Sequence, residues 1–155
     1  MSVTARLAAL GITLPAPTTP IASYVPFVRV GDLLVVSGQL PMQDGKLHAT
    51  GKLGAEVDLA TGQAAARLCA INLLAQMQAA LGSLDQVVRV VRLGGFIACT
   101  ADFFDHAKIV NGASDLMLEV FGDNGRHART SIGVPSLPMN AAVEIDGMFA
   151  VKPVE

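Results

Sequence analysis

The stretch HARTSIGVPSLPMNAAVEID, residues 127–146, predicts two strands joined by a loop that contains Pro135 and Pro138. Each strand carries a charged residue among apolar neighbours, Arg129 in the first strand and Glu144 in the second. If the loop folds the strands back antiparallel, Arg129 lies opposite Glu144, above an apolar sheet face. An exposed ion pair of this kind contributes only about 0–1 kcal/mol, so the pattern alone does not distinguish a surface pair from a functional site.

Alternation sorts the other residues of the two strands by face, because successive side chains point to opposite sides of a strand. In the first strand, Arg129 and Ser131 share one face and Ile132 lies on the other. In the second strand, Glu144 lies opposite an apolar face. The residues of that apolar face are Val143, Ile145 and Phe149.

The composition predicts a single domain that leaves apolar surface exposed. A chain of 155 residues is long enough for one core and too short for two. Hydrophobic residues make up 52% of it and charged residues 15%, with a mean hydropathy of +0.50, so apolar surface should remain exposed after the chain has folded. A homo-oligomer would bury that surface.

The sequence disfavours several classes of protein. Its longest apolar region, residues 68–82, is interrupted by an Asn and two Gln residues and predicts a core helix rather than a membrane span. The first residues predict an amphipathic turn or short helix rather than a signal peptide. Cys69 and Cys99 have neither metal nor redox spacing, which favours a reduced, cytoplasmic protein. A net charge of −2 without clustered Lys and Arg disfavours nucleic-acid binding.

The remaining pattern predicts strands and helices in the order ββ, α, β, α, ββ. Residues 27–41 predict a hairpin, and Asp44-Gly45 marks another turn. Helices are expected at about residues 58–81 and 103–121, with a strand at 86–98 between them. This order predicts an α+β fold in which two helices cover one face of a mixed sheet. The other face is expected to pack against further copies around a symmetry axis.

Motifs at several separate points share a pattern with one known family. The chain resembles the reactive-intermediate deaminases, the YjgF/YER057c/UK114 family, also called endoribonuclease L-PSP. The resemblance runs from Tyr24 to the C-terminus, so residues 1–155 are expected to form one domain with residues 1–20 as an N-terminal extension. The matching residues are Tyr24, Ser37 and Gly38 in VVSGQLP, Asn111, Arg129-Thr130-Ser131, Leu137-Pro138 and Val143-Glu144-Ile145.

The resemblance implies a chorismate-mutase-like homotrimer with ligand clefts between subunits. The implied reaction is hydrolysis of 2-imino and 2-enamino acids to 2-keto acids and ammonia, without cofactor or metal. Carried over residue by residue, Arg129 and Glu144 are implied to be catalytic. The implied substrate-binding residues are Tyr24, Ser37, Gly38, Asn111 and Ser131.

The chain also departs from the family pattern near this site. Ser131 occupies a position that is often Cys in the best-known members, which argues against thiol chemistry there. Arg126-His127 replaces a common Phe-Pro before Ala128-Arg129, so the cleft entrance differs in polarity. His127 is the one histidine next to the expected site.

The chemistry of the residues agrees with the implied reaction. The planar guanidinium of Arg129 can donate two parallel hydrogen bonds to a small carboxylate, such as that of a 2-imino or 2-keto acid. Glu144 can position a water and take its proton. Two other functions remain open: a non-catalytic trimer that binds or senses small carboxylates, and a ribonuclease. The acidic balance disfavours the ribonuclease.

Overall fold

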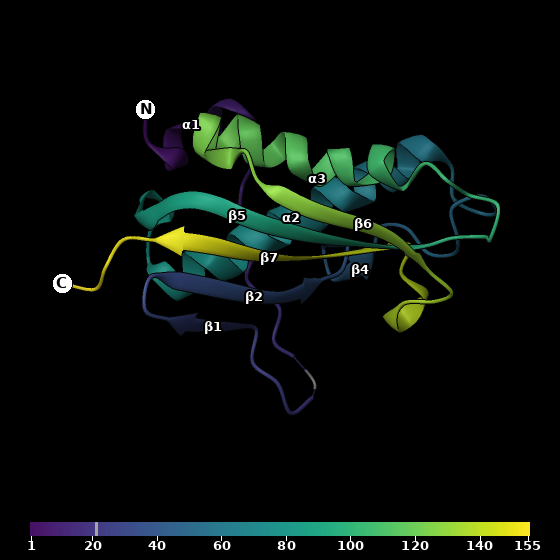
Figure 1. Cartoon of the computed structure of the whole chain (residues 1–155), viewed down its shortest axis with the longest axis horizontal. Coiled ribbons are helices and arrows are strands. Elements are labelled where there is room, and N and C mark those ends of the chain that lie inside the picture. Colours follow the sequence, from purple (N-terminus) through teal and green to yellow (C-terminus); the bar gives the residue numbers. More distant parts are fainter. Residues whose placement is uncertain (21) are drawn as a thin grey trace.

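A five-stranded mixed sheet forms the frame of the computed structural model, which describes residues 1–20 and 22–155 (Figure 1). All neighbouring strands run antiparallel except β5 (Val87–Ala98) and β6 (Ala128–Val134), which run parallel. A two-stranded hairpin of β3 (Met42–Gln43) and β4 (Lys46–Leu47) turns at Asp44-Gly45. In spatial order the strands of the main sheet are β1 (Phe27–Val30), β2 (Leu33–Gln39), β7 (Val143–Val151), β5 (Val87–Ala98) and β6 (Ala128–Val134).

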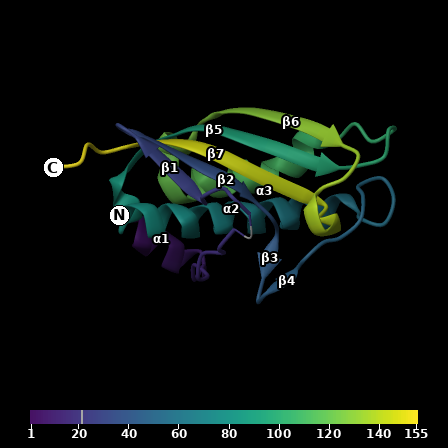
Figure 2. The ribbon, with the colours of Figure 1, turned by 90° about the horizontal axis from the view of Figure 1, so that it is seen from below.

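Two long helices cover one face of this sheet, as predicted, and Figure 2 shows both on the same side. The first, α2 (Leu59–Leu81), begins where the Asp58 side chain accepts a hydrogen bond from the Thr61 amide and ends at Gly82, whose φ of 76° suits glycine. By length and composition α2 could cross a membrane, but it packs as a core helix against β2, β7 and the second helix. The α+β fold is therefore confirmed.

The second long helix, α3 (His106–Phe121), starts three residues later than the sequence predicts. The Phe103 amide donates to the Thr100 carbonyl and the Thr100 hydroxyl to Asp102, so a turn occupies the expected first residues of the helix. After α3 the short helix η2 (Gly122–Gly125) leads into β6.

The N-terminal segment forms a short helix, α1 (Val3–Ala9), which confirms the expected turn or helix. Leu7 is buried, and the Arg6 guanidinium donates to the Val120 carbonyl near the end of α3 at 3.2 Å. The Val3 amide donates to Asp85 at 2.9 Å, in the short helix η1 (Leu84–Gln86). These contacts join α1 to the domain.

The prediction that the last two strands pair with each other is wrong, because β5 lies between them. On one edge β5 aligns Leu93 with Arg129 of β6, and on the other it aligns Phe96 with Glu144 of β7. Parallel neighbours require a crossover connection, and α3 supplies it between β5 and β6. The segment 135–142, which contains η3 (Pro138–Asn140), then carries the chain past the end of β5 to its other side.

The same register places the two charges on opposite faces of the sheet. Arg129 shares a row with Leu93, which is fully buried against the helices, so Arg129 faces α3. Glu144 shares a row with Phe96 and points to the face without helices. Ile132 also lies on that face and is 43% exposed. The two faces of β6 are therefore reversed relative to the prediction, which placed Arg129 and Ser131 away from the apolar side of the sheet.

The alternation predicted for β7 is confirmed, and the sheet face without helices is partly apolar. The three apolar residues expected in the core from β7 are fully buried. Among the described residues, no helix covers the opposite face (Figure 2). Exposed apolar side chains along it are Val28, Val30, Leu33 and Ile132.

Gly112 allows a close approach of the two helices, because a Cβ there would collide with the Gln63 carbonyl of α2. We expect Gly112→Ala to lower the free energy of unfolding by about 1–3 kcal/mol, since the helices must move apart. Asp115→Ala, on the exposed side of the same helix, should change it by less than about 0.5 kcal/mol. Urea unfolding measures both, and equal effects would contradict the proposed close contact.

Candidate functional site

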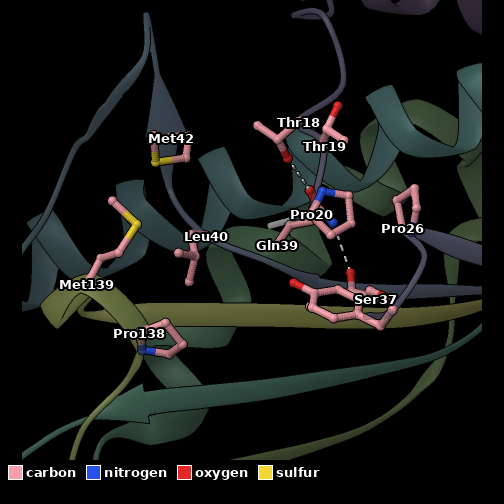
Figure 3. Close-up of a pocket in the computed structure, with 12 residues that line it drawn as sticks. Thr18, Thr19, Pro20, Pro26, Ser37, Gln39, Leu40, Met42, Pro138 and Met139 are labelled. Carbon is pink, nitrogen blue, oxygen red and sulfur yellow. Dashed lines mark hydrogen bonds between the residues drawn. The ribbon is translucent and has the colours of Figure 1, made fainter. Parts of the chain in front are cut away.

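One pocket lies beside β2 and brings together three of the residues singled out in the sequence, Tyr24, Ser37 and Gly38. Figure 3 shows Ser37 among the labelled residues that line it. Its volume is about 330 Å³. The Ser37 hydroxyl donates to the Val25 carbonyl at 2.7 Å, which fixes the bend that carries Tyr24. The other lining residues are Thr18, Thr19, Pro20, Pro26, Gln39, Leu40, Met42, Pro138 and Met139.

Gln39 joins the segment around Thr18 to β2 at this pocket. It is almost completely buried, donates to the Ser37 carbonyl at 3.0 Å, and accepts from the Thr18 hydroxyl at 3.4 Å, as the dashed lines of Figure 3 show. A buried amide with partners on both sides holds two segments in one geometry. The pocket wall formed by Thr18 is therefore tied to β2.

Glu144 lies directly beside Gly38. A Cβ at Gly38 would collide with the Glu144 carboxylate, so glycine allows the acid to approach the β2 backbone. Glu144 is half-buried, and this burial raises the pKa of its carboxyl group, as does the negative charge of Asp146. A carboxylate with a raised pKa is a stronger base than an exposed one, which suits it to proton transfer.

A second group of predicted residues surrounds Arg129 on the helix side of the sheet. One terminal nitrogen of the guanidinium, Nη1, donates to Asn111 Oδ1 at 2.8 Å and to Ser114 Oγ at 3.0 Å. The other, Nη2, donates to the Ala107 carbonyl at 3.1 Å. All three acceptors belong to α3, which therefore fixes the guanidinium at the β6 edge of the sheet.

Ser131 lies on the same side of β6 as Arg129. It is aligned with Gly95, where a Cβ would collide with Val110 of α3. Its Oγ is buried and has no hydrogen-bond partner within the described part of the chain. A buried hydroxyl without a partner costs free energy, so this position calls for an explanation beyond packing.

The predicted site residues thus form two separate groups within one chain. Tyr24, Ser37 and Gly38 accompany Glu144 near β2 and β7. Asn111 and Ser131 accompany Arg129 at β6 and α3. The prediction that Arg129 and Glu144 meet within a single chain is wrong, because β5 separates their strands and they face opposite sides of the sheet.

Two further residues belong to the Arg129 group and were not predicted as site residues. Ser114 Oγ lies 2.9 Å from His127 Nε2, and His127 Nδ1 lies 2.6 Å from the Gly125 carbonyl oxygen. Burial lowers the pKa of His127, the hydrogen bond to the Gly125 carbonyl opposes this, and the positive charge of Arg129 lowers the pKa further. The signal for Ser114 was present in the sequence, because it follows Asn111 by three residues and so shares its face of a helix.

Neither thiol is suited to act as a nucleophile. Burial raises the pKa of both the Cys69 and Cys99 thiols, so both remain protonated at neutral pH. Cys99 lies 3.6 Å from His106 Nε2 beside a separate hollow at the ends of β5 and β6. Among the described residues, no group of three His, Cys, Asp or Glu side chains is arranged to hold a metal ion.

Comparison with known proteins places the chain in a family. A family model described as YjgF/chorismate mutase-like, whose description also carries the name endoribonuclease, matches residues 4–150. Protein TCP17 of Trypanosoma cruzi is 51% identical over 97% of this chain and 94% of its own length.

Solved structures share the fold. Protein Atu1372 of Agrobacterium tumefaciens is 49% identical, with a TM-score of 0.91 over 97% of this chain and 92% of that one. E. coli TdcF, solved with bound serine, is 27% identical, with a TM-score of 0.63 over 91% of this chain and 96% of that one. With a family match across nearly its whole length, the chain belongs to the YjgF/chorismate-mutase-like family.

Proposed function

We propose that the protein is a homotrimer that hydrolyses 2-imino and 2-enamino acids to 2-keto acids and ammonia in clefts shared by two subunits. The observation that carries this proposal is the division of the candidate residues into two groups on opposite faces of one sheet. Each group has the chemistry of half a site. A second copy can bring the Glu144 group of one chain against the Arg129 group of another.

Two features of the surface favour such an assembly. The sheet face without helices exposes several apolar side chains, which an oligomer would bury. β6, which carries Arg129, is an edge strand of the sheet. A closed ring of copies covers both the apolar face and the edge strand.

Arg129 is assigned to the substrate carboxylate. A guanidinium has five N–H donors. Three are donated to α3 in the described part of the chain, which leaves two, the number that a bidentate carboxylate accepts. The bound serine of E. coli TdcF supports a ligand of this class, because serine is a 2-amino acid.

Glu144 is assigned to the attacking water. The carboxylate takes a proton as the water oxygen bonds to the imine carbon, and it then returns that proton to the nitrogen. The carboxylate then removes the proton of the new hydroxyl group and passes it to the nitrogen as the carbon–nitrogen bond breaks, so that ammonia leaves and the carbon becomes the carbonyl of a 2-keto acid. Tyr24, Ser37 and Gly38 line the approach to Glu144, while Asn111 and Ser131 complete the carboxylate side.

The first test follows release of 2-keto acid when 2-aminoacrylate is generated by a coupled enzyme. We expect Arg129→Ala to lower kcat/KM by about 100-fold or more, because charge-assisted hydrogen bonds to the carboxylate are lost. Arg129→Lys keeps the charge but not the fork and should restore little of the rate. Glu144→Gln should lower kcat by about 10²–10⁴-fold. Keto-acid binding by the wild type without any acceleration would instead identify a carboxylate-binding or sensor trimer.

A shared cleft has a consequence for mixed trimers. Inactive Arg129→Ala and Glu144→Gln chains, unfolded and refolded together in equal amounts, should recover about a quarter of wild-type activity, because a quarter of randomly formed clefts combine both intact halves. Each variant refolded alone is the control. Light scattering should give three times the 16.1 kDa mass of one chain. Absence of recovery, or a single-chain mass, would contradict the shared cleft.

The raised pKa of Glu144 predicts the acid limb of the rate profile. Glu144 must be ionised to accept a proton, so kcat/KM should fall as the pH falls through its pKa. The charge of Asp146 is one cause of the raised pKa, so Asp146→Asn should move this limb to lower pH. Asp115→Asn removes a carboxylate at an exposed position on α3 and should leave the limb in place. An unchanged limb in Asp146→Asn would count against Glu144 as the base.

A further inference from the structure

A continuous chain of hydrogen bonds lies behind the Arg129 guanidinium. It passes from Arg129 Nη1 to Ser114 Oγ at 3.0 Å, from Ser114 Oγ to His127 Nε2 at 2.9 Å, and from His127 Nδ1 to the Gly125 carbonyl at 2.6 Å. Ser114 is 9% exposed, so its hydroxyl depends on these protein partners. These hydrogen bonds join β6, α3 and the turn before β6 through one serine.

The partners determine where the hydrogens lie. A carbonyl oxygen only accepts, so His127 Nδ1 carries the hydrogen that it donates to Gly125. In a neutral imidazole Nε2 is then an acceptor, and it takes the hydrogen of the Ser114 hydroxyl. The Ser114 oxygen is left free to accept from Arg129, whose guanidinium can only donate. Every hydrogen bond in the chain therefore runs in one direction, from Arg129 to Gly125.

Burial lowers the pKa of the His127 ring, against the hydrogen bond to the Gly125 carbonyl, which raises it, and the side chains around the ring include two arginines. Arg129 of β6 faces the ring, and Arg126, in the segment before β6, lines a surface hollow together with Arg129 and His127. Arg89 of β5 donates to the Arg126 carbonyl at 2.9 Å. Asp123 lies 3.5 Å from the Arg126 guanidinium and has a 98% exposed side chain, so water screens its charge. The α3 residues beside the ring, Ser114 and Leu118, carry no charge.

We propose that His127 is a positioning residue that, through Ser114, holds the Arg129 guanidinium ready for a substrate carboxylate. The proposal rests on the proposed function in assigning the carboxylate to Arg129. The neutral ring is the acceptor that fixes the Ser114 hydroxyl. Without it, that hydroxyl can rotate to donate to a carbonyl of its own helix, and its oxygen no longer presents the same lone pair to Arg129.

Loss of this arrangement should weaken binding without abolishing it. Arg129 keeps its bonds to Asn111 and to the Ala107 carbonyl, so the guanidinium stays near α3 with one restraint fewer. A single hydrogen bond of this kind changes affinity by about two- to tenfold. Because the effect is on placement of the carboxylate, KM should rise and kcat should change less.

The first experiment tests the hydrogen-bond chain without any ligand. Nitrogen-15 NMR of the intact protein at pH 7.5 distinguishes the two neutral tautomers of a histidine. The chain has three histidines, and His127→Gln assigns the signal. We expect His127 to carry its hydrogen on Nδ1. Hydrogen on Nε2, or a ring charged at this pH, would overturn the proposal.

The second experiment compares two substitutions of similar size by calorimetric titration with 2-oxobutanoate at pH 7.5. His127→Gln retains an oxygen that can accept from Ser114, whereas His127→Leu offers no acceptor. We expect a two- to tenfold weaker affinity in His127→Leu and a nearly wild-type affinity in His127→Gln. Wild-type affinity in His127→Leu, or equal weakening in both variants, would overturn the positioning role.

Failure of the proposed function would be recognised separately. If the wild type binds no 2-keto acid, the carboxylate assignment of Arg129 fails while the hydrogen-bond chain can still be tested. Side-chain NMR of the Arg129 Nε–H group then decides, with Arg129→Lys assigning its signal. Motion of the guanidinium should be faster in His127→Leu than in the wild type and in His127→Gln. Equal motion of the guanidinium in all three proteins would overturn the proposed chain of hydrogen bonds.

Discussion

The position of β5 between β6 and β7 is the constraint on which the rest of the structure depends. Because α3 connects β5 to β6, the two strands are parallel neighbours, and β7 must pair with the other edge of β5. The side chains of Arg129 and Glu144 are then fixed on opposite faces of the sheet. A single chain folded in this way cannot bring a carboxylate-binding fork and a base together. The topology itself therefore favours a cleft between copies.

The two groups of residues differ in their electrostatic environment, and the difference matches their proposed roles. Arg129 is held by neutral acceptors on α3, so its charge stays available to an anion. Glu144 is half-buried near Asp146, and both burial and that charge raise its pKa. Arg92 lies 3.8 Å from Asp146 and donates to the Thr130 hydroxyl, so it links β5 to β6 and β7 on the same face as Glu144. A cation near Asp146 limits how far its charge disturbs Glu144.

Much of the fold could be predicted from local patterns. The Asp58 cap, the apolar period and Gly82 define α2, and alternation correctly predicts the buried face of β7. The pairing of the last two strands could not be predicted, because the strand patterns do not show which strands become neighbours, and a proline-containing loop can lead into a hairpin or past another strand. For the same reason, the prediction of which side chains of β6 face the helices was wrong. A lone Arg on a strand does not reveal that helix acceptors lie beneath it.

The arrangement of the candidate site residues was predicted only in part. Tyr24, Ser37 and Gly38 do gather in one pocket, and Asn111 does contact Arg129. The hydrogen bonding of Ser131 is one property that the sequence does not predict. Its oxygen is buried without a partner in the described chain, where a thiol would tolerate the lack of a strong hydrogen bond better than a hydroxyl does. Burial keeps both cysteines of the chain protonated, which agrees with water as the nucleophile of the proposed reaction and with the base proposed at Glu144.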